Sequence, residues 1–394
     1  MKEFVNKGIR LAAYVLKANK TFSVPGKAKI LVVDGCRLEV LTPLFNGENY
    51  EVLYTRGEIL NLNIVVILKA FINWAHGNSF FLSHAMAFLD IVKPSVVITF
   101  SDNNALFQQL DAKTNCESVK FITIQNGTRA LSRDNPKGSK PVYHSNFFCF
   151  GNYEVDQYKS HGACVQTFYP CGSLLDSYYR SLSRMIEERA QMDLCLVSEG
   201  LHAFSYDSPY GQSRRAFERL MDYIRIFIAR NKRSLLVACR YSANTREVSA
   251  EIDYFYAHLG KDTMCTPNNS QRLTSYSLTD NARVVVCGFS TLLREATSEL
   301  SLGQTFGRGR KILACNYSDE TIYDFPVDGI WSLNEQGYTL FEERLLALFS
   351  MDPDSYRKLS SAPASYLVGY SEANPTHLLL QSVIADQIGN YRHN

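Results

Sequence analysis

The sequence lacks the short motifs by which several classes of enzyme are recognised. It contains no CxxC pair, no HExxH or HxxE pattern, no GxSxG turn and no glycine loop ending in Lys-Ser or Lys-Thr. Zinc sites, α/β-hydrolase catalysis and P-loop nucleotide hydrolysis depend on such spacings. The sequence therefore favours chemistry that needs no metal ion and no bound cofactor.

A large net charge of either sign is also absent. The 394 residues include 41 lysines and arginines and 39 acidic residues, which gives a formal charge of +2. A protein that is drawn to nucleic acid by its overall field carries a much larger basic excess. We therefore expect no nucleic-acid partner.

No apolar run is long enough to cross a membrane. The best candidate, residues 59–75, contains three asparagines and Lys69 and is shorter than the ~20 residues that a bilayer requires. It is predicted to form a buried helix. Residues 1–20 carry basic side chains among apolar ones, and they form either a solvated helix or an amphipathic helix in peripheral contact with the inner membrane surface.

Paired cysteines are absent as well. The ten cysteines are scattered, and Cys149, Cys195 and Cys287 lie within apolar runs, where a thiol acts as a small hydrophobic side chain. This pattern is typical of reduced thiols rather than of a disulfide framework. The N-terminus also lacks the apolar core of a signal peptide. We expect a cytoplasmic protein.

Strands and helices alternate along the first half of the chain. At 394 residues the chain exceeds the ~250–300 residues that one hydrophobic core supports, so two domains are expected. Strands are predicted at 27–35, 95–100, 119–127, 145–151 and 165–172, and helices at 57–74, 79–92, 103–112 and 152–161. Such alternation predicts a parallel sheet with crossover helices.

The same alternation restarts after a polar segment. Strands are predicted at 192–200, 233–241, 282–288 and 310–316, and helices at 212–230, 245–259 and 290–302. We therefore predict an α/β fold of two Rossmann-like domains that face each other across a cleft. The predicted divisions are a first domain at 1–176, a linker at 177–191, a second domain at 192–372 and a C-terminal helix at 373–394, placed to pack back on the first domain.

The residues that follow each strand are the candidates for a site, because ligands of open parallel sheets bind beyond the carboxyl ends of the strands. Gly288 permits a close backbone approach, and Ser290 or Thr291 opens a helix that carries Glu295. This arrangement suits a phosphate at the helix start and a glutamate that accepts ribose hydroxyls. The alternative is an ordinary N-cap followed by an ordinary acid.

Polar residues also follow the strands of the first half. Asp102 ends one predicted strand, Asn126 ends the next, and Asp34 lies at the same sheet edge. Asp102 is the preferred general base, with Asp34 in reserve, because a carboxylate at a strand end is rigidly placed to deprotonate an acceptor hydroxyl. The alternatives are that Asp102 caps the helix 103–112 and that Asn126 belongs to a turn.

A third group of candidates lies in the second half. Ser198, Glu199 and Gly200 follow its first strand, and Arg240 follows its second. A guanidinium at this edge suits the phosphate oxygens of a donor. An ion pair on the surface or between the domains is the other role open to Arg240.

Several segments carry a family resemblance. CGFSTLLREA (287–296), followed by a small-residue turn and the strand KILAC (311–315), resembles the donor-binding segment of GT-B glycosyltransferases. ITFSDNNALFQ (98–108), FITIQNGTR (121–129) and residues 148–175 resemble the first domain of bacterial surface-carbohydrate biosynthesis proteins, a GT-B-like group.

The resemblance implies a transfer reaction. A nucleotide-sugar donor would be held by the second domain through Ser290, Thr291 and Glu295, and a glycan or lipid-linked glycan acceptor by the first domain. The product would be a surface glycan of the capsule or lipopolysaccharide O-antigen type, made without a metal ion. A nucleotide-sugar epimerase of the same fold and a non-catalytic sugar- or nucleotide-binding subunit are the alternatives.

Overall fold

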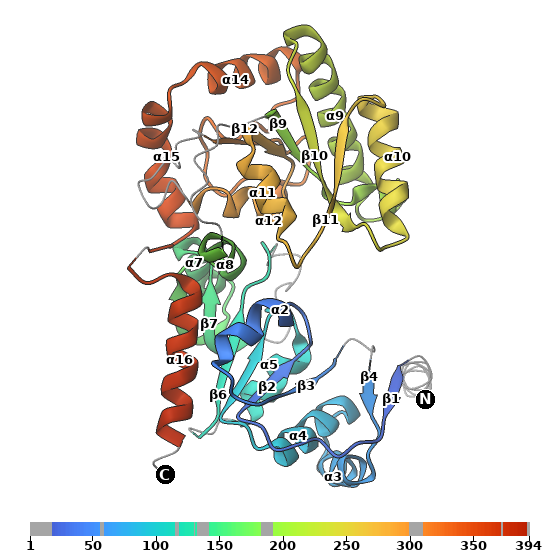
Figure 1. The fold of residues 1–394 in the computed structure, drawn as a ribbon, viewed down its shortest axis with the longest axis vertical. Helices are drawn as coiled ribbons and strands as arrows, with labels where there is room; N and C mark the ends of the chain where they lie inside the picture. The colour runs from blue at the N-terminus through green and yellow to red at the C-terminus, as the bar shows by residue number, and fades with distance from the viewer. Residues whose placement is uncertain are drawn as a thin grey trace.

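The structure is a computed structural model that contains two parallel sheets, one above the other in Figure 1. It describes residues 18–55, 59–114, 118–129, 131, 142–182, 192–298, 310–371 and 373–391. Residues 1–17 and most of the predicted linker, 183–191, lie outside this description. The predicted divisions at 176, 191 and 372 stay a prediction.

The first sheet has six parallel strands. In spatial order they are β3 (Tyr50–Leu53), β2 (Ile30–Val33), β5 (Val96–Thr99), β6 (Lys120–Ile124), β7 (Tyr143–Cys149) and β8 (Cys164–Pro170). The order runs outward in one direction from β2 and in the other from β5. The connections therefore reverse between β2 and β5, which is where ligands of such sheets bind.

The second sheet has five parallel strands and the same kind of reversal. In spatial order they are β11 (Met264–Asn268), β10 (Leu235–Ser242), β9 (Met192–Val197), β12 (Ala282–Cys287) and β13 (Lys311–Ala314). Here the order reverses between β9 and β12. The predicted fold class, two Rossmann-like halves, is confirmed.

Helices cover the sheets. Those of the first half are α2 (Leu38–Leu41), α3 (Ile64–Ala75), α4 (Phe80–Val92), α5 (Ala105–Thr114), α7 (Asn152–Ser160) and α8 (Leu174–Leu182). Those of the second half are α9 (Gly211–Asn231), α10 (Glu247–Leu259), α11 (Thr274–Asp280), α12 (Thr291–Glu295), α14 (Tyr338–Ser350) and α15 (Pro353–Leu367). The last helix, α16 (Thr376–Tyr391), crosses back to pack against α8 and the first sheet (Figure 1).

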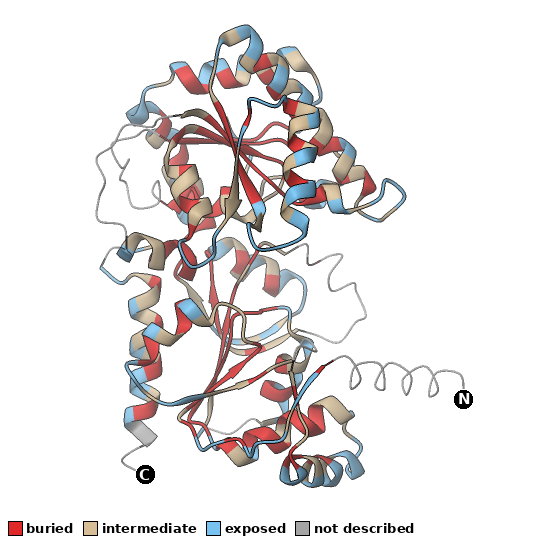
Figure 2. Cartoon of the chain, turned by 45° about the vertical axis from the view of Figure 1, so that its right-hand side comes forward, coloured by how far each residue is buried: buried red, intermediate tan, exposed pale blue. Residues whose placement is uncertain are grey.

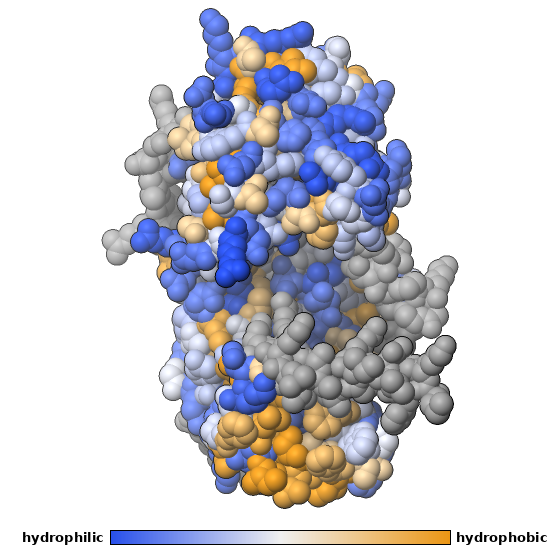
Figure 3. Space-filling view, turned by 90° about the vertical axis from the view of Figure 1, so that its right-hand side faces the viewer, coloured by the Kyte–Doolittle hydropathy of each residue, from blue (hydrophilic) through white to orange (hydrophobic). Residues whose placement is uncertain are grey.

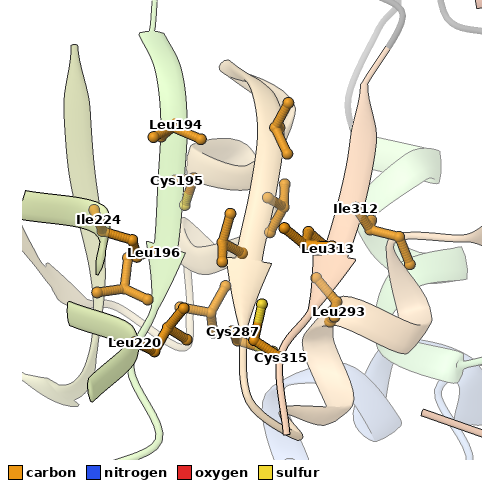
Figure 4. Packing of buried hydrophobic residues seen from close by; sticks show 14 of the residues in the cluster. Leu194, Cys195, Leu196, Leu220, Ile224, Cys287, Leu293, Ile312, Leu313 and Cys315 are labelled. Atoms are coloured by element: carbon orange, nitrogen blue, oxygen red, sulfur yellow. The ribbon is translucent and has the colours of Figure 1, made fainter. Parts of the chain in front are cut away.

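Strands β2, β5 and β13 are buried along their whole length and the other central strands over most of it, as the red colour of both sheets in Figure 2 shows. Leu194 and Leu196 pack with Leu220 and Ile224 of α9 in the second core (Figure 4), which also includes Val285. Fully burying one such aliphatic side chain stabilises the fold by ~1.5–3 kcal/mol. Cys195, Cys287 and Cys315 lie in the same core as free thiols, and burial raises the pKa of Cys195 to about 12.

Two local predictions were wrong. Residues 59–61, predicted as helix, form β4 (Ile59–Asn61), which pairs in parallel with β1 (Asn19–Thr21). The helix that follows, α3, was predicted to be buried, but only Val66 and Ala70 are buried and its outward face is exposed (Figure 2). Across the part of the chain that the structure describes, no helix combines the length and apolarity needed to span a membrane.

Candidate functional site

A cleft of about 460 Å³ lies where the carboxyl ends of the two sheets meet. Its lining includes Asn126, Thr128 and Arg129 from the first half and, from the second half, residues of β9 and β10 and of the segments after β9 and β12. Seven of the predicted site residues line it: Asn126, Ser198, Glu199, Arg240, Ser290, Thr291 and Glu295. Asp34, Asp102, Gly200 and Gly288 are not among its lining residues.

Glu199 organises the loop that follows β12. Its Oε1 accepts hydrogen bonds from the backbone N–H of Gly288 at 2.7 Å and of Phe289 at 2.8 Å. Burial raises the pKa of the Glu199 carboxyl to about 7, against the opposing effect of these two hydrogen bonds. The amide of Gly288, expected to face a phosphate, is therefore engaged by a protein carboxylate, and its role toward a donor stays a prediction.

Arg240 is held at the cleft by the residues after β9. Its Nη1 donates to the carbonyl oxygen of Glu199 at 2.7 Å, and its backbone N–H donates to Glu251 at 2.9 Å. Glu251 also accepts from Ser198 Oγ. Gly200 has a φ of 68°, and a Cβ there would lie 2.7 Å from Arg240 Cδ. Gly200 therefore acts on the cleft through Arg240, which packs across it.

Glu295 lines the cleft from α12 and is buried. It accepts a hydrogen bond from Ser173 Oγ of the first half and contacts Tyr276 of the second. Burial raises the pKa of Glu295 to about 7. A carboxyl group with a pKa near neutrality exchanges its proton readily at physiological pH.

Ser290 and Thr291 both have structural partners. Ser290 is the N-cap of α12, because its Oγ accepts from the backbone N–H of Leu292 at 3.3 Å. Thr291 Oγ1 accepts from the backbone N–H of Thr128 at 3.0 Å, which joins the two halves across the cleft. Ser290 is thus the ordinary N-cap that the sequence offered as the alternative to a phosphate ligand. Thr291 instead contacts the first half of the chain.

Asp102 lies beneath the cleft surface. Arg129 Nε donates to its Oδ2 at 2.8 Å, and Tyr158 OH donates to the same atom at 3.3 Å. Arg129 also donates to Asn126 Oδ1. Asn126 and Arg129 both line the cleft, and Asp102 orients them through these hydrogen bonds. Asp34, with a φ of 68°, accepts from Ser101 Oγ at 3.3 Å. Neither aspartate is among the residues that line the cleft, and the role of each as a general base stays a prediction.

Arg129 is the functional candidate that sequence reasoning missed. It comes three residues after Asn126, at the end of the segment FITIQNGTR, whose first four residues belong to β6. A basic residue so close to a strand end was the available signal. Its partner Asp102 lies 27 positions away, so the pairing itself is visible only in the folded chain.

A buried ion pair joins the halves beside the cleft. Arg294 of α12 pairs with Glu154 of α7, and both side chains are at most 5% exposed. Glu154 also accepts from the backbone N–H of Gly151 at 3.1 Å, and Arg294 lies 4.7 Å from the ring centroid of Tyr153. A second contact between the halves lies close by in sequence: Ser298 Oγ donates a hydrogen bond to Asp176 Oδ2 of α8 at 2.7 Å. The position of α12, and with it one wall of the cleft, depends on these contacts.

Metal ligands do not cluster in the described ranges: no three His, Cys, Asp or Glu side chains there are placed to hold a metal ion together. Catalysis without a metal or cofactor stays a prediction.

Comparison with known proteins defines the fold. No family model matches the chain, and no curated protein matches it in sequence. Solved structures match over nearly the whole length. The S. aureus protein MnaA, solved with UDP, is 11% identical, with a TM-score of 0.54 over 93% of this chain and 97% of its own. A UDP-GlcNAc 2-epimerase from Methanocaldococcus jannaschii, solved with UDP-GlcNAc and UDP, is 11% identical, with a TM-score of 0.52 over 94% and 99%.

The wall teichoic acid polymerase TagF is also similar, with 11% identity and a TM-score of 0.52 over 93% of this chain and 90% of its own. Together with the two sheets that reverse at facing edges, these similarities define the class: the chain has a GT-B-like α/β fold. At such low identity the likeness extends to the fold alone.

Proposed function

We propose that this protein is a metal-independent glycosyltransferase that moves a sugar from a nucleotide-activated donor to a growing surface glycan of the capsule or O-antigen type. The observation that carries the proposal is the composition of the cleft, where Arg129 and Arg240 lie with Glu199 and Glu295. Guanidinium groups bind and neutralise phosphate oxygens of a leaving nucleotide. The donor is assigned to the second half and the acceptor to the first.

The acid–base role is assigned to the glutamates of the cleft. Asp102 and Asp34, preferred from the sequence, are not among the lining residues, and Asp102 accepts a hydrogen bond from Arg129. Glu199 and Glu295 do line the cleft, and burial raises the pKa of each to about 7. A group that titrates near the working pH both accepts and returns a proton efficiently. Asp102 then acts as a positioning residue for Asn126 and Arg129.

Other parts of the proposal concern the protein's surroundings. The enzyme works in the cytoplasm, and residues 1–20 contact the inner membrane surface, where a lipid-linked acceptor would be found. Removal of these residues followed by vesicle flotation tests that contact: unchanged partitioning would contradict it.

A nucleotide-sugar epimerase is the second candidate. It is favoured by the TM-score of 0.52 to a UDP-GlcNAc 2-epimerase and by two titratable carboxyl groups in one cleft. An epimerase requires groups that remove and return a proton, and it converts its substrate without an acceptor. A non-catalytic binding subunit would hold the nucleotide-sugar without consuming it.

Binding is tested first, by the melting temperature of the purified protein with CMP, UDP, GDP, CDP, dTDP and their sugars. A ligand that binds the folded state stabilises it by about 2.7 kcal/mol at 100 times its Kd. Arg240→Ala is expected to abolish the shift caused by the preferred nucleotide. Arg225→Ala is the matched control, because Arg225 is half-exposed on α9 and pairs with Asp222.

Product analysis then separates the candidates. The donor that stabilises the protein is incubated with and without a glycan acceptor, and its sugar is followed by mass spectrometry and NMR. Sugar transfer that depends on the acceptor supports the proposal, and isomerised donor without acceptor supports the epimerase. Binding with neither product indicates the non-catalytic subunit, and the absence of any nucleotide effect contradicts all three.

A further inference from the structure

Helix α3 has an unusual distribution of apolar side chains. Its sequence, IVVILKAFINWA, contains only two polar residues, Lys69 and Asn73. One side, with Val66 and Ala70, packs on α4. The opposite side exposes large apolar side chains: Ile64 (65%), Val65 (41%), Leu68 (57%), Phe71 (48%), Ile72 (61%) and Trp74 (49%). Apolar helices of this kind normally occur with all sides covered.

The exposed surface extends beyond the helix. Phe22 and Val24, 68% and 59% exposed, lie on the segment that follows β1. Asn63 Nδ2, at the start of α3, donates to the carbonyl oxygen of Phe22 at 2.8 Å. This bond fixes the segment beside the helix. We call Phe22, Val24 and the six exposed residues of α3 the α3 patch; Figure 3 shows apolar side chains gathered at this end of the molecule.

The stretches that carry the α3 patch are basic, and one acid, Glu51 of β3, lies beside them, where its Oε1 accepts from the backbone N–H of Gly26 at 2.9 Å. No aspartate or glutamate occurs at residues 18–29 or 59–89, the stretches that carry β1, β4, α3 and most of α4. Lys20 on β1 and Lys69 on α3 itself supply positive charge. A basic excess beside an apolar surface complements the anionic lipids of a membrane surface.

We infer that the α3 patch binds the surface of a phospholipid bilayer that contains anionic lipids, with Phe71, Ile72 and Trp74 inserted at the level of the headgroups. Tryptophan and phenylalanine are favoured at this interface, where such helices bury their apolar face ~5–10 Å deep. The inference does not depend on the proposed function. It concerns described residues only: Phe22, Val24 and the exposed side chains of α3.

The size of the α3 patch argues against a second copy of the chain as the occupant. A helix of 12 residues is ~18 Å long and ~10 Å wide, so its outward face covers on the order of 200 Å². Phe22 and Val24 enlarge this surface only at one end of the helix. A stable protein interface buries about 800 Å² on each partner. A bilayer sets no such minimum and needs no matching shape.

The test is co-sedimentation of the full chain with vesicles of phosphatidylglycerol and phosphatidylethanolamine, and with phosphatidylcholine vesicles for comparison. The wild type is expected to bind the anionic vesicles, more weakly as salt rises. A triple variant, Leu68→Ser, Phe71→Ser and Ile72→Ser, is expected to lose at least tenfold in binding. The matched control is Leu346→Ser, Leu359→Ser and Leu378→Ser, three similarly exposed leucines on α14, α15 and α16.

Tryptophan fluorescence supplies a second readout. The chain has two tryptophans, and Trp331 is only 6% exposed. Anionic vesicles are therefore expected to shift the emission of Trp74 to shorter wavelength and to protect it from acrylamide, and Trp74→Phe is expected to remove both effects. The triple variant must melt at the wild-type temperature for its result to count; otherwise Trp74→Phe alone decides.

Three outcomes overturn the inference. Vesicle binding that the triple serine variant retains would place the contact elsewhere, as would binding that is lost equally in the control variant. Protection of Trp74 from acrylamide before vesicles are added would mean that protein already covers the α3 patch. A wild-type dimer in light scattering that the triple variant converts to monomer, with no vesicle binding, would identify a second copy as the occupant.

Discussion

The Oε1 atom of Glu199 lies 2.7 Å from the backbone nitrogen of Gly288, 89 positions further along the chain. The carboxylate thereby occupies the sheet edge between β9 and β12, where the strand order reverses. Gly288 is required there for a steric reason, because a Cβ on that residue would lie 2.7 Å from the same oxygen.

Gly288→Ala is expected to lower the free energy of unfolding by ~1–3 kcal/mol, since the new methyl group displaces the Glu199 carboxylate. Urea denaturation measures the change. Gly389→Ala is the control: nothing lies within 4 Å of its added Cβ on α16, where alanine favours the helix by ~0.5–1 kcal/mol. Equal stability of the Gly288→Ala variant and the wild type would show that the loop adapts without cost.

Asp102→Asn is expected to destabilise the fold by ~1–3 kcal/mol and to weaken nucleotide binding, because the Arg129 guanidinium loses its charged partner and its fixed position. Thermal shift with and without nucleotide measures both effects. The control, Asp222→Asn, removes one partner of an exposed pair with Arg225 and should change stability by less than ~1 kcal/mol. A catalytic base would instead show normal binding with kcat reduced.

The rate of sugar transfer is expected to rise as pH passes upward through about 7, where Glu199 and Glu295 lose their protons and can act as bases. Glu295→Gln is expected to reduce kcat by ~10²–10⁴ and to flatten this limb of the profile if it is the base. Glu199→Gln, made separately, assigns the role between the two. A profile that neither variant changes would exclude both residues as the titrating group.

Stability is expected to fall in mild acid because of His144. This side chain is fully buried on β7, and burial lowers its pKa from 6.5 to about 4. A group whose folded-state pKa is lowered contributes stability above its unfolded pKa, so the loss sets in below pH 6.5 and is complete below pH 4.

The difference between the two pKa values corresponds to about 3 kcal/mol. Urea unfolding between pH 7 and pH 4 measures it, and His144→Gln is expected to show a shallower slope. Exposed His161→Gln is the control and should keep the wild-type slope. A wild-type slope in His144→Gln would attribute the acid sensitivity to other groups.

The strands could be predicted from sequence where they are buried on both faces. VVIT of β5 and VVVC of β12 are continuous β-branched runs, which are typical of central parallel strands. Strand β11 escaped prediction because its sequence, MCTPN, contains a proline and no such run, and it lies at the sheet edge. Its position follows from pairing with β10, which no local pattern encodes.

The sequence predicted several of the residues that line the cleft, but not the hydrogen bonds and ion pairs that hold them. Residues after the strands do gather at one cleft, because parallel strands bring their carboxyl ends to the same edge. Which of them face the opening depends on partners distant in sequence. Asp102 is engaged by Arg129 and Tyr158. Helix α3 packs on α4 with one side and exposes the opposite side, which its apolar sequence did not indicate.

The contacts of α12 with the first half set a rule for building hybrid proteins from this fold. A chimera that keeps residues 192–372 but takes its first half from another protein would part Arg294 from Glu154, and Glu295 from Ser173. It would bury a guanidinium without a counter-charge, which costs about 3–5 kcal/mol. A stable hybrid therefore needs the first-half residues that contact α12 together with the second half, wherever the two sequences are joined.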